Sequence, residues 1–232
     1  MLIVFDVDGT LVGGEPTDWA SFEGAFEEVA GFALDGTFWE GLEEVTAQAV
    51  VHQALKDSSP EKKAGMVHAV RDGYLRRLQA AHKNDSSSFP ALEGVLALSE
   101  ELKGQGIPVA IGTGDWFETS TFKLGAAGIP LDNLPMVTSS DFYSRGDIIA
   151  GAAAKAGRPL QETVYVGDGL WDLRSCQKLG IPFIGVGHRK EKLENAGAAY
   201  TLPDLSPVSF WPVMEMIWKP DPAAAPSNAV GG

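Results

Sequence analysis

The sequence predicts an α/β protein whose core is an open, parallel β-sheet and which carries a second, helical unit. Three observations lead to this fold class. Short apolar runs are continuous rather than alternating, as in strands buried on both faces. Helical patterns separate these runs, and strands that alternate with helices form right-handed βαβ units. A long stretch near the N-terminus is helical throughout, so we place it outside the sheet.

The core strands are expected at four apolar runs bounded by Gly, Asp or Pro. They are Leu2–Phe5, Pro108–Ile111, Thr163–Val166 and Pro182–Val186. Four helices are expected around these strands, the first of them marked by Leu and Val residues at helical spacing. They are Leu92–Lys103, Phe117–Ala127, Asp147–Ala156 and Leu170–Lys178.

Residues 15–89 are predicted to form a helical insertion between the first strand and the rest of the sheet. Thr37 and Glu40 have the spacing of a capping box and predict a helix that runs on to Ala49. Ser59, with a proline next to it, predicts the start of a further helix. Aromatic residues of the insertion are expected to form its core, and the alternative that some of them face a ligand stays open. They are Trp19, Phe22, Phe26, Phe38 and Trp39.

The domain boundaries follow from this insertion. Residues 1–14 and 90–218 are expected to form a discontinuous α/β core, and residues 15–89 a helical unit. Residues 219–232 are rich in Pro, Ala and Gly without any periodicity, so we expect a disordered tail there.

Composition narrows the classes of protein and partner. The chain has 232 residues and a net charge of −13, and such an acidic surface repels the phosphate backbone of nucleic acids. No apolar run approaches the ~20 residues of a membrane span. The single Cys176 allows neither an intrachain disulfide nor a zinc site built from cysteines. We therefore expect a soluble, cytoplasmic protein that binds neither nucleic acid nor membrane.

Carboxylates follow two of the predicted strands at the point where each strand ends. Asp6 and Asp8, separated by one residue and followed by Gly9, come directly after the first strand. Asp168 follows a later strand, and Asp172 lies on the helix that begins there. Ligands bind at this edge of an open α/β sheet, and buried carboxylates that lie close together require a cation. Four hard oxygen donors favour Mg²⁺.

Two further features suit a phosphate group. Thr113 and Gly114 end another strand, where the hydroxyl and the following N–H groups can hold a phosphoryl oxygen. A basic residue is also needed to balance the phosphate charge, and Arg145 and Lys155 are the two candidates. We assign this role to Arg145, because it lies in the loop that enters a helix at the same sheet edge. Lys155, two turns further on, is expected to be a solvated helix residue.

Together these motifs resemble those of the haloacid dehalogenase-like (HAD) hydrolases. The resemblance rests on Asp-x-Asp-Gly-Thr from Asp6, a strand that ends in Thr113, the basic Arg145, and Gly-Asp-Gly-x-x-Asp around Asp168. Their order and approximate spacing match over residues 1–217. The helical insertion after the first motif resembles the helical cap that many members carry there. The resemblance implies a Rossmann-like sheet core with a helical cap domain.

The resemblance also implies a role for each motif residue. Asp6 corresponds to the nucleophile that becomes an aspartyl-phosphate, and Asp8 to the general acid/base. Thr113 corresponds to the residue that hydrogen-bonds the phosphoryl group, and Arg145 to the residue that neutralises it.

The metal ligands are implied in the same way. Asp168, Asp6 and the backbone carbonyl of Asp8 correspond to the Mg²⁺ ligands, and Asp172 to a supporting carboxylate.

From these motifs we predict an Mg²⁺-dependent phosphatase that hydrolyses a small phosphate monoester through an aspartyl-phosphate. The expected partner is a small phosphorylated metabolite, and the protein is expected to be a monomer or homodimer. A phosphomutase acting on a sugar phosphate is the alternative, because it would use the same core chemistry. A non-catalytic binding protein on the same fold is a third reading, although it would require the loss of a motif.

Overall fold

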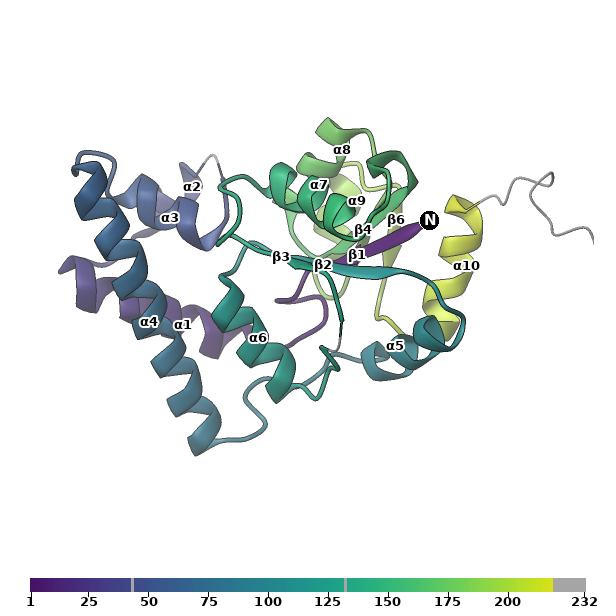
Figure 1. The fold of residues 1–232 in the computed structure, drawn as a ribbon, viewed down its shortest axis with the longest axis horizontal. Helices are drawn as coiled ribbons and strands as arrows, with labels where there is room; N and C mark the ends of the chain where they lie inside the picture. Colours follow the sequence, from purple (N-terminus) through teal and green to yellow (C-terminus); the bar gives the residue numbers. More distant parts are fainter. Residues whose placement is uncertain (43, 132, 219–232) are drawn as a thin grey trace, which may run out of the picture.

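The computed structural model of the chain describes residues 1–42, 44–131 and 133–218, so the tail predicted at 219–232 lies outside the described residues. Within these ranges six parallel strands form one sheet in the order β3-β2-β1-β4-β5-β6 (Figure 1). This is the strand order of a Rossmann-like sheet, so the predicted fold class is confirmed. The strands are β1 (Leu2–Phe5), β2 (Val109–Gly112), β3 (Met136–Val137), β4 (Thr163–Gly167), β5 (Phe183–Val186) and β6 (Tyr200–Leu202).

The four predicted strands are present, with ends that agree to within one residue. Two further strands, β3 and β6, were not predicted from the sequence. They have two and three residues and lie at the two edges of the sheet. Runs this short produce no apolar pattern that stands out from a loop.

Helices cover both faces of the sheet because successive residues of each strand point to opposite sides. Ile3 and Phe5 of β1 pack into one apolar cluster, and Leu2 and Val4 into the other. The first cluster contains residues of α5 (Val95–Gly104), α6 (Phe117–Ala126) and α10 (Pro207–Ile217). The second contains residues of α7 (Arg145–Lys155), α8 (Leu170–Leu179) and α9 (Lys190–Asn195). A short 3₁₀ turn, η1 (Leu160–Glu162), precedes β4.

Two of the predicted core helices begin elsewhere than expected, for local reasons. Helix α5 starts at Val95 rather than Leu92, because Gly94 adopts a left-handed φ of +83° and the Leu92 N–H donates to the Leu11 carbonyl. Helix α7 starts at Arg145 rather than Asp147, because the Ser144 hydroxyl caps it by accepting from the Asp147 N–H.

The insertion contains the helices α1 (Glu15–Ala30), α2 (Gly36–Glu40), α3 (Ala47–Ala54) and α4 (Pro60–Asn84). Ser59 caps α4 as predicted, by accepting from the Lys62 N–H. The capping box expected at Thr37 is wrong, because Asp35 accepts from the Phe38 N–H and caps α2 in its place. The helix expected to reach Ala49 is therefore two helices, and Thr46 caps the second of them.

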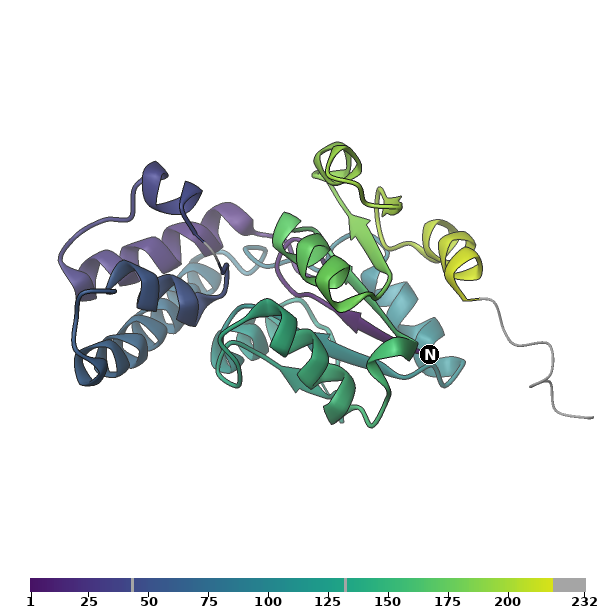
Figure 2. The same ribbon diagram turned by 90° about the horizontal axis from the view of Figure 1, so that it is seen from above.

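These four helices, hereafter the cap, stand to one side of the sheet in both Figure 1 and Figure 2. Within the cap α1 packs on α4, and α4 also packs against α6 of the core. The apolar cluster on that face of the sheet runs on into the cap through buried residues such as Phe22 and Tyr74. In the ranges that the structure describes, no helix has the length and apolar content needed to cross a bilayer.

Candidate active site

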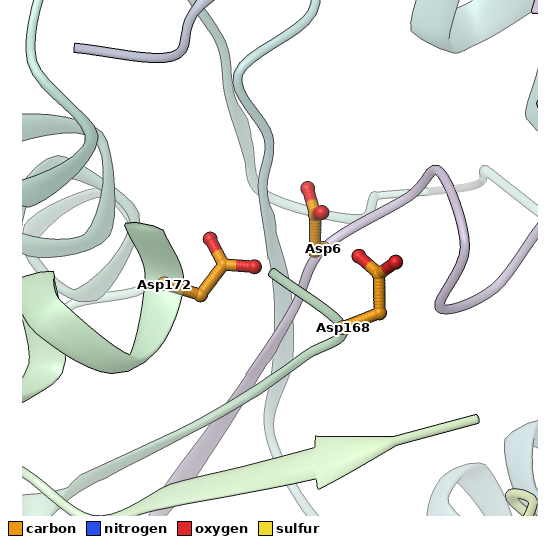
Figure 3. A group of neighbouring side chains, drawn as sticks. All are labelled: Asp6, Asp168 and Asp172. Carbon is orange, nitrogen blue, oxygen red and sulfur yellow. The ribbon is translucent and has the colours of Figure 1, made fainter. Parts of the chain in front are cut away.

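Three carboxylates converge at the carboxyl ends of the two central strands. Asp6 follows β1, Asp168 follows the adjacent strand β4, and Asp172 lies in the first turn of α8. All three are buried, and each offers an oxygen within 4.8 Å of the others (Figure 3). The structure thus brings together three of the four acidic residues that the sequence analysis assigned to the metal.

A tight loop holds this cluster together. Gly9 has a left-handed φ of +74°, and a Cβ atom there would lie 2.4 Å from Oδ2 of Asp168. Glycine therefore lets the loop after β1 approach the carboxylate from β4. The carboxylate of Asp172 is itself oriented, because its Oδ2 accepts a hydrogen bond from the Gly169 N–H at 3.1 Å.

The donor set fits a divalent cation. Burial, together with the charge of Asp6, raises the pKa of Asp168 well above its ordinary value. Burial also raises the pKa of Asp172 to about 7, although Arg145 opposes this shift. Hard carboxylate oxygens gathered in a water-poor cluster are the ligands that Mg²⁺ prefers, and a bound cation would favour their ionised forms.

Arg145 closes one side of the cluster. Its Nη1 lies 3.1 Å from Oδ1 of Asp6 and its Nε 3.3 Å from Oδ1 of Asp172, and the side chain is buried. Burial disfavours the charged guanidinium, but the two carboxylates outweigh it and raise the pKa of Arg145. Lys155, by contrast, is exposed and donates to the Met136 carbonyl at 2.9 Å. Of the two candidate cations, only Arg145 lies at the carboxylate cluster.

Thr113 and Gly114 lie directly after β2, beside Asp6. Thr113 is 1% exposed, and its Oγ1 accepts from the Asp115 N–H. A Cβ atom on Gly114 would lie 2.4 Å from Nη2 of Arg145, so the backbone there passes close to the guanidinium. Thr113 and Gly114 line the same cavity as Asp6 and Arg145.

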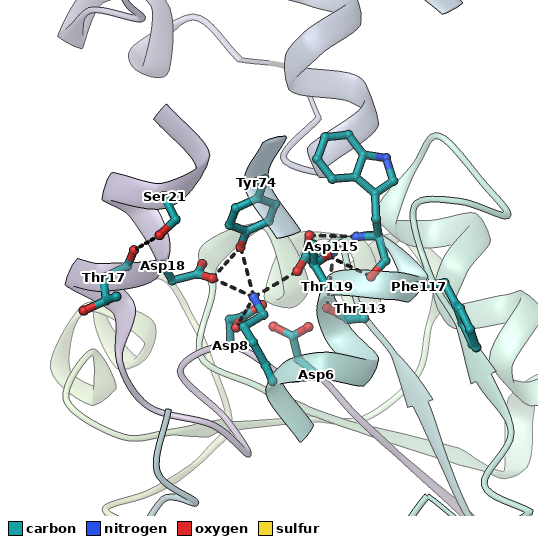
Figure 4. A network of polar contacts seen from close by, with 12 residues as sticks. Asp6, Asp8, Thr17, Asp18, Ser21, Tyr74, Thr113, Asp115, Phe117 and Thr119 are labelled. Atoms are coloured by element: carbon teal, nitrogen blue, oxygen red, sulfur yellow. Dashed lines mark hydrogen bonds and ion pairs between the residues drawn. The ribbon is translucent and has the colours of Figure 1, made fainter. Parts of the chain in front are cut away.

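Asp8 lies in a different environment from the three clustered carboxylates. Its Oδ1 is 2.6 Å from Nζ of Lys123, a lysine of α6 whose side chain is completely buried. Nζ also lies 2.8 Å from Asp18 of the cap and 2.9 Å from Asp115 of the core. These contacts converge on one nitrogen in Figure 4.

Tyr74 of α4 completes this network. Lys123 Nζ donates to its hydroxyl oxygen at 3.1 Å, and the hydroxyl in turn donates to Asp18. Burial raises the pKa of Asp8 and of Asp115, against the lowering effect of Lys123. Burial opposes the charge on Lys123, but the surrounding carboxylates outweigh it and raise its pKa. One buried ammonium therefore joins Asp8 to two residues of the cap.

The sequence analysis missed Lys123, although a signal was present. Lys123 lies three residues after Ser120 and four before Ala127, on the face of α6 that is buried. A lysine on the apolar face of a helix is rarely buried unless it has a charged partner.

Arg189 is a second residue that the sequence analysis missed. It follows β5, and its Nη1 lies 2.8 Å from Oδ2 of Asp168. Its Nη2 lies 2.7 Å from Oε1 of Glu15, the first residue of α1. Arg189 therefore links the beginning of the cap to the carboxylate cluster, through residues more than 170 positions apart.

The connection between α2 and α3 also reaches the site. The Ala47 N–H donates to the Gly114 carbonyl at 2.7 Å, and the Val45 carbonyl accepts from Nη2 of Arg145 at 3.3 Å. The Thr46 hydroxyl donates to the Tyr143 carbonyl at 2.9 Å. The cap thus closes over an inner cavity of about 110 Å³ whose lining includes both Asp6 and Asp8.

A parallel sheet with carboxylates at the ends of its central strands, and a helical cap beside them, is the architecture of a Rossmann-like enzyme core. Residues 3–186 match the family described as haloacid dehalogenase-like hydrolase, and the chain belongs to that family. This match confirms the family and the hydrolase class that the motifs predicted.

Several known proteins are similar to this chain. The phosphoglycolate phosphatase of Rhodobacter capsulatus is 23% identical over 215 residues, which cover 88% of this chain and 93% of that protein. A hydrolase from Pseudomonas syringae has a TM-score of 0.73 at 20% identity, covering 94% of this chain and 99% of its own. The β-phosphoglucomutase of Clostridium difficile has a TM-score of 0.72 at 17% identity, covering 92% and 95%. At identities of 20% and 17%, the two solved structures show that this chain has the same fold as they do.

Proposed function

We propose that this protein is an Mg²⁺-dependent phosphatase that hydrolyses a small phosphate monoester through an aspartyl-phosphate intermediate. The observation that carries this proposal is that the two motif carboxylates, Asp6 and Asp8, contact different cations. Asp6 lies 3.1 Å from the guanidinium of Arg145, whereas Asp8 is held 2.6 Å from the ammonium of Lys123. Two carboxylates in two environments suit one nucleophile and one acid/base.

In the first half-reaction the Asp6 carboxylate attacks phosphorus. A bond forms between a carboxylate oxygen and phosphorus while the ester P–O bond breaks, and Asp8 gives its proton to the departing alkoxide. Arg145 faces the phosphoryl oxygens, and Thr113 donates a hydrogen bond to one of them. Phosphoryl transfer depends mainly on positioning and on charge stabilisation, which these residues supply.

In the second half-reaction Asp8, now ionised, takes a proton from a water molecule that attacks the aspartyl-phosphate. This step releases inorganic phosphate and restores the Asp6 carboxylate and the protonated form of Asp8. Asp6, Asp168 and the Asp8 carbonyl would hold Mg²⁺, with Asp172 in support, and the bound cation supplies positive charge to the phosphoryl group.

Lys123 is the positioning residue for Asp8 in this mechanism. It contacts Asp8, Asp18 and Tyr74 together, so the acid/base is fixed only where α1 and α4 of the cap meet the core. The proposed function thereby gives the cap a role in orienting Asp8.

A phosphomutase is the second candidate, because it would use the same core chemistry as the phosphatase. A mutase must hold a second phosphate, and the cavity offers little for it. Among the described residues lining the inner cavity, Arg145 is assigned to the transferred phosphoryl group, and the other cation, Arg189, is paired with Glu15 and Asp168. Hydrolysis therefore fits the site better than transfer between two phosphates.

The test is a screen of phosphorylated metabolites with purified protein in the presence of Mg²⁺, with release of inorganic phosphate as the readout. We expect turnover without any added bisphosphate. Turnover that requires a sugar bisphosphate would identify a mutase. Absence of turnover, combined with ligand binding, would identify a binding protein.

A further inference from the structure

Aromatic side chains from both the cap and the core surround the place where a leaving group would lie. Trp19 of α1 and Trp39 of α2 meet edge to face, with their ring centroids 5.0 Å apart. Trp171 of α8 approaches from the core side and has the Arg189 guanidinium 6.0 Å from its ring centroid. All three indoles are half-buried, and all three line the inner cavity that holds Asp6.

The same indoles line a second, outer cavity of about 440 Å³. Leu42, Leu170 and Leu193 complete its apolar walls, and Glu23 and Lys192 are exposed residues that line it as well. The two cavities share six lining residues, so they adjoin. These shared residues are Trp19, Trp39, Val45, Asp168, Trp171 and Arg189. A phosphoryl group at Asp6 would therefore place its ester substituent toward the tryptophans.

The charge of the inner cavity opposes a negatively charged substituent. Of its described lining residues, six carry carboxylates and two carry guanidiniums, and both guanidiniums are already paired. The carboxylates are Asp6, Asp8, Glu15, Asp18, Asp115 and Asp168. These six carboxylates share three cations: Asp8, Asp18 and Asp115 contact Lys123, Asp6 contacts Arg145, and Glu15 and Asp168 contact Arg189. A carboxylate on the substrate would therefore compete with these carboxylates for the same cations.

We propose that the substrate is a phosphate monoester of an uncharged aromatic alcohol, whose ring lies between the cap tryptophans and Trp171. This inference rests on the proposed phosphatase function and names its substrate class. Burial and edge-to-face contacts both stabilise a bound aromatic ring, and three indoles around an apolar space offer both. Esters that carry a carboxylate or a second phosphate are disfavoured by the surrounding carboxylates.

Arg189 offers an alternative way to bind a charged substrate. If Arg189 released Glu15, its guanidinium would become available to a substrate carboxylate in the same cavity. The experiment therefore compares ligands that differ in charge, and it includes a binding measurement that does not depend on turnover.

The kinetic arm uses benzyl phosphate, 4-carboxybenzyl phosphate and ethyl phosphate with the wild-type protein and Mg²⁺. The two benzyl esters have similar leaving groups and differ in charge. We expect kcat/KM for benzyl phosphate to exceed both others by about tenfold or more. Trp39→Ala should lower the benzyl-to-ethyl ratio of kcat/KM by a similar factor. The matched control, Trp211→Ala on α10 at the opposite end of the sheet from the cap, should leave that ratio unchanged (Figure 1).

The binding arm uses benzylphosphonate and phosphonoacetate, which cannot be hydrolysed, and measures each dissociation constant by calorimetry. Tighter binding of benzylphosphonate by about tenfold is the expected result. Equal or tighter binding of phosphonoacetate would overturn the proposal and would assign Arg189 to a substrate carboxylate. If benzylphosphonate binds selectively but no ester is turned over, the substrate class stands and the phosphatase function fails.

Discussion

Replacing Lys123 by Met is the sharpest test of how this site works. The substitution keeps a long, unbranched side chain and removes the ammonium from a completely buried position. Asp8, Asp18 and Asp115 would lose a partner that lies 2.6, 2.8 and 2.9 Å away, respectively. Removing one partner of a buried ion pair costs about 3–5 kcal/mol of stability. We expect a loss of that order in the free energy of unfolding, measured with urea.

The catalytic effect should depend on the leaving group, because Lys123 acts through Asp8. General acid catalysis contributes about 10²–10⁴-fold, so kcat/KM for ethyl phosphate should fall by about 10²-fold or more. For p-nitrophenyl phosphate, whose leaving group departs without a proton, the fall in kcat/KM should be much smaller. The parameter kcat/KM is used because it reports the steps up to formation of the phosphoenzyme.

Tyr74→Phe serves as the milder companion, because it removes one hydroxyl from the network and keeps the lysine. It should lower kcat/KM in the same leaving-group-dependent way, by a smaller factor. An equal loss on both esters in folded Lys123→Met and Tyr74→Phe would refute the reasoning. Lys123 would then support the fold and not the orientation of Asp8.

Three further predictions concern the carboxylate cluster. Asp6→Asn should abolish turnover and leave the thermal unfolding transition cooperative, and substantial phosphate release by this variant would contradict the proposed nucleophile. Asp168→Ala should raise the Mg²⁺ concentration needed for activity, because the variant lacks one carboxylate ligand. The wild-type protein should be inactive in the presence of a chelator, because the chelator withdraws the cation. Full activity in chelator would exclude the metal role. Arg145→Ala should lower kcat/KM by about 10²–10³-fold, whereas Lys155→Ala should change it by less than about threefold. The reverse ranking would show that the wrong cation was assigned.

Much of the site could be predicted from sequence because it lies next to buried strands. Asp6, Thr113 and Asp168 each follow a strand at the same sheet edge, and parallel strands bring their carboxyl ends together. The position of Arg145 also follows from topology, since a helix that crosses between two parallel strands begins at that edge.

The helices of the cap were less predictable, because their apolar periodicity is weak and neighbouring residues compete to cap the same helix N-terminus. Asp35 and Thr37 both have side chains that can cap, and the sequence alone does not show that Asp35 takes the Phe38 N–H. The aromatic residues illustrate the same limit. Phe26 is buried in the cap as expected, whereas Trp19 and Trp39 turn to the cavity. Helical spacing shows which residues share one face of a helix, but whether that face contacts the core or a cavity depends on how the helices pack.

The parallel sheet, the motif carboxylates and their common edge could be read from short runs of neighbouring residues. Which charged side chains contact one another could be seen only in the folded chain. Lys123 lies 105 positions from Asp18 and Arg189 lies 174 from Glu15, yet each pair is in contact. Such pairs form because a charge removed from water needs an opposite charge nearby. That partner is chosen by how the cap folds back onto the core, which no local pattern encodes.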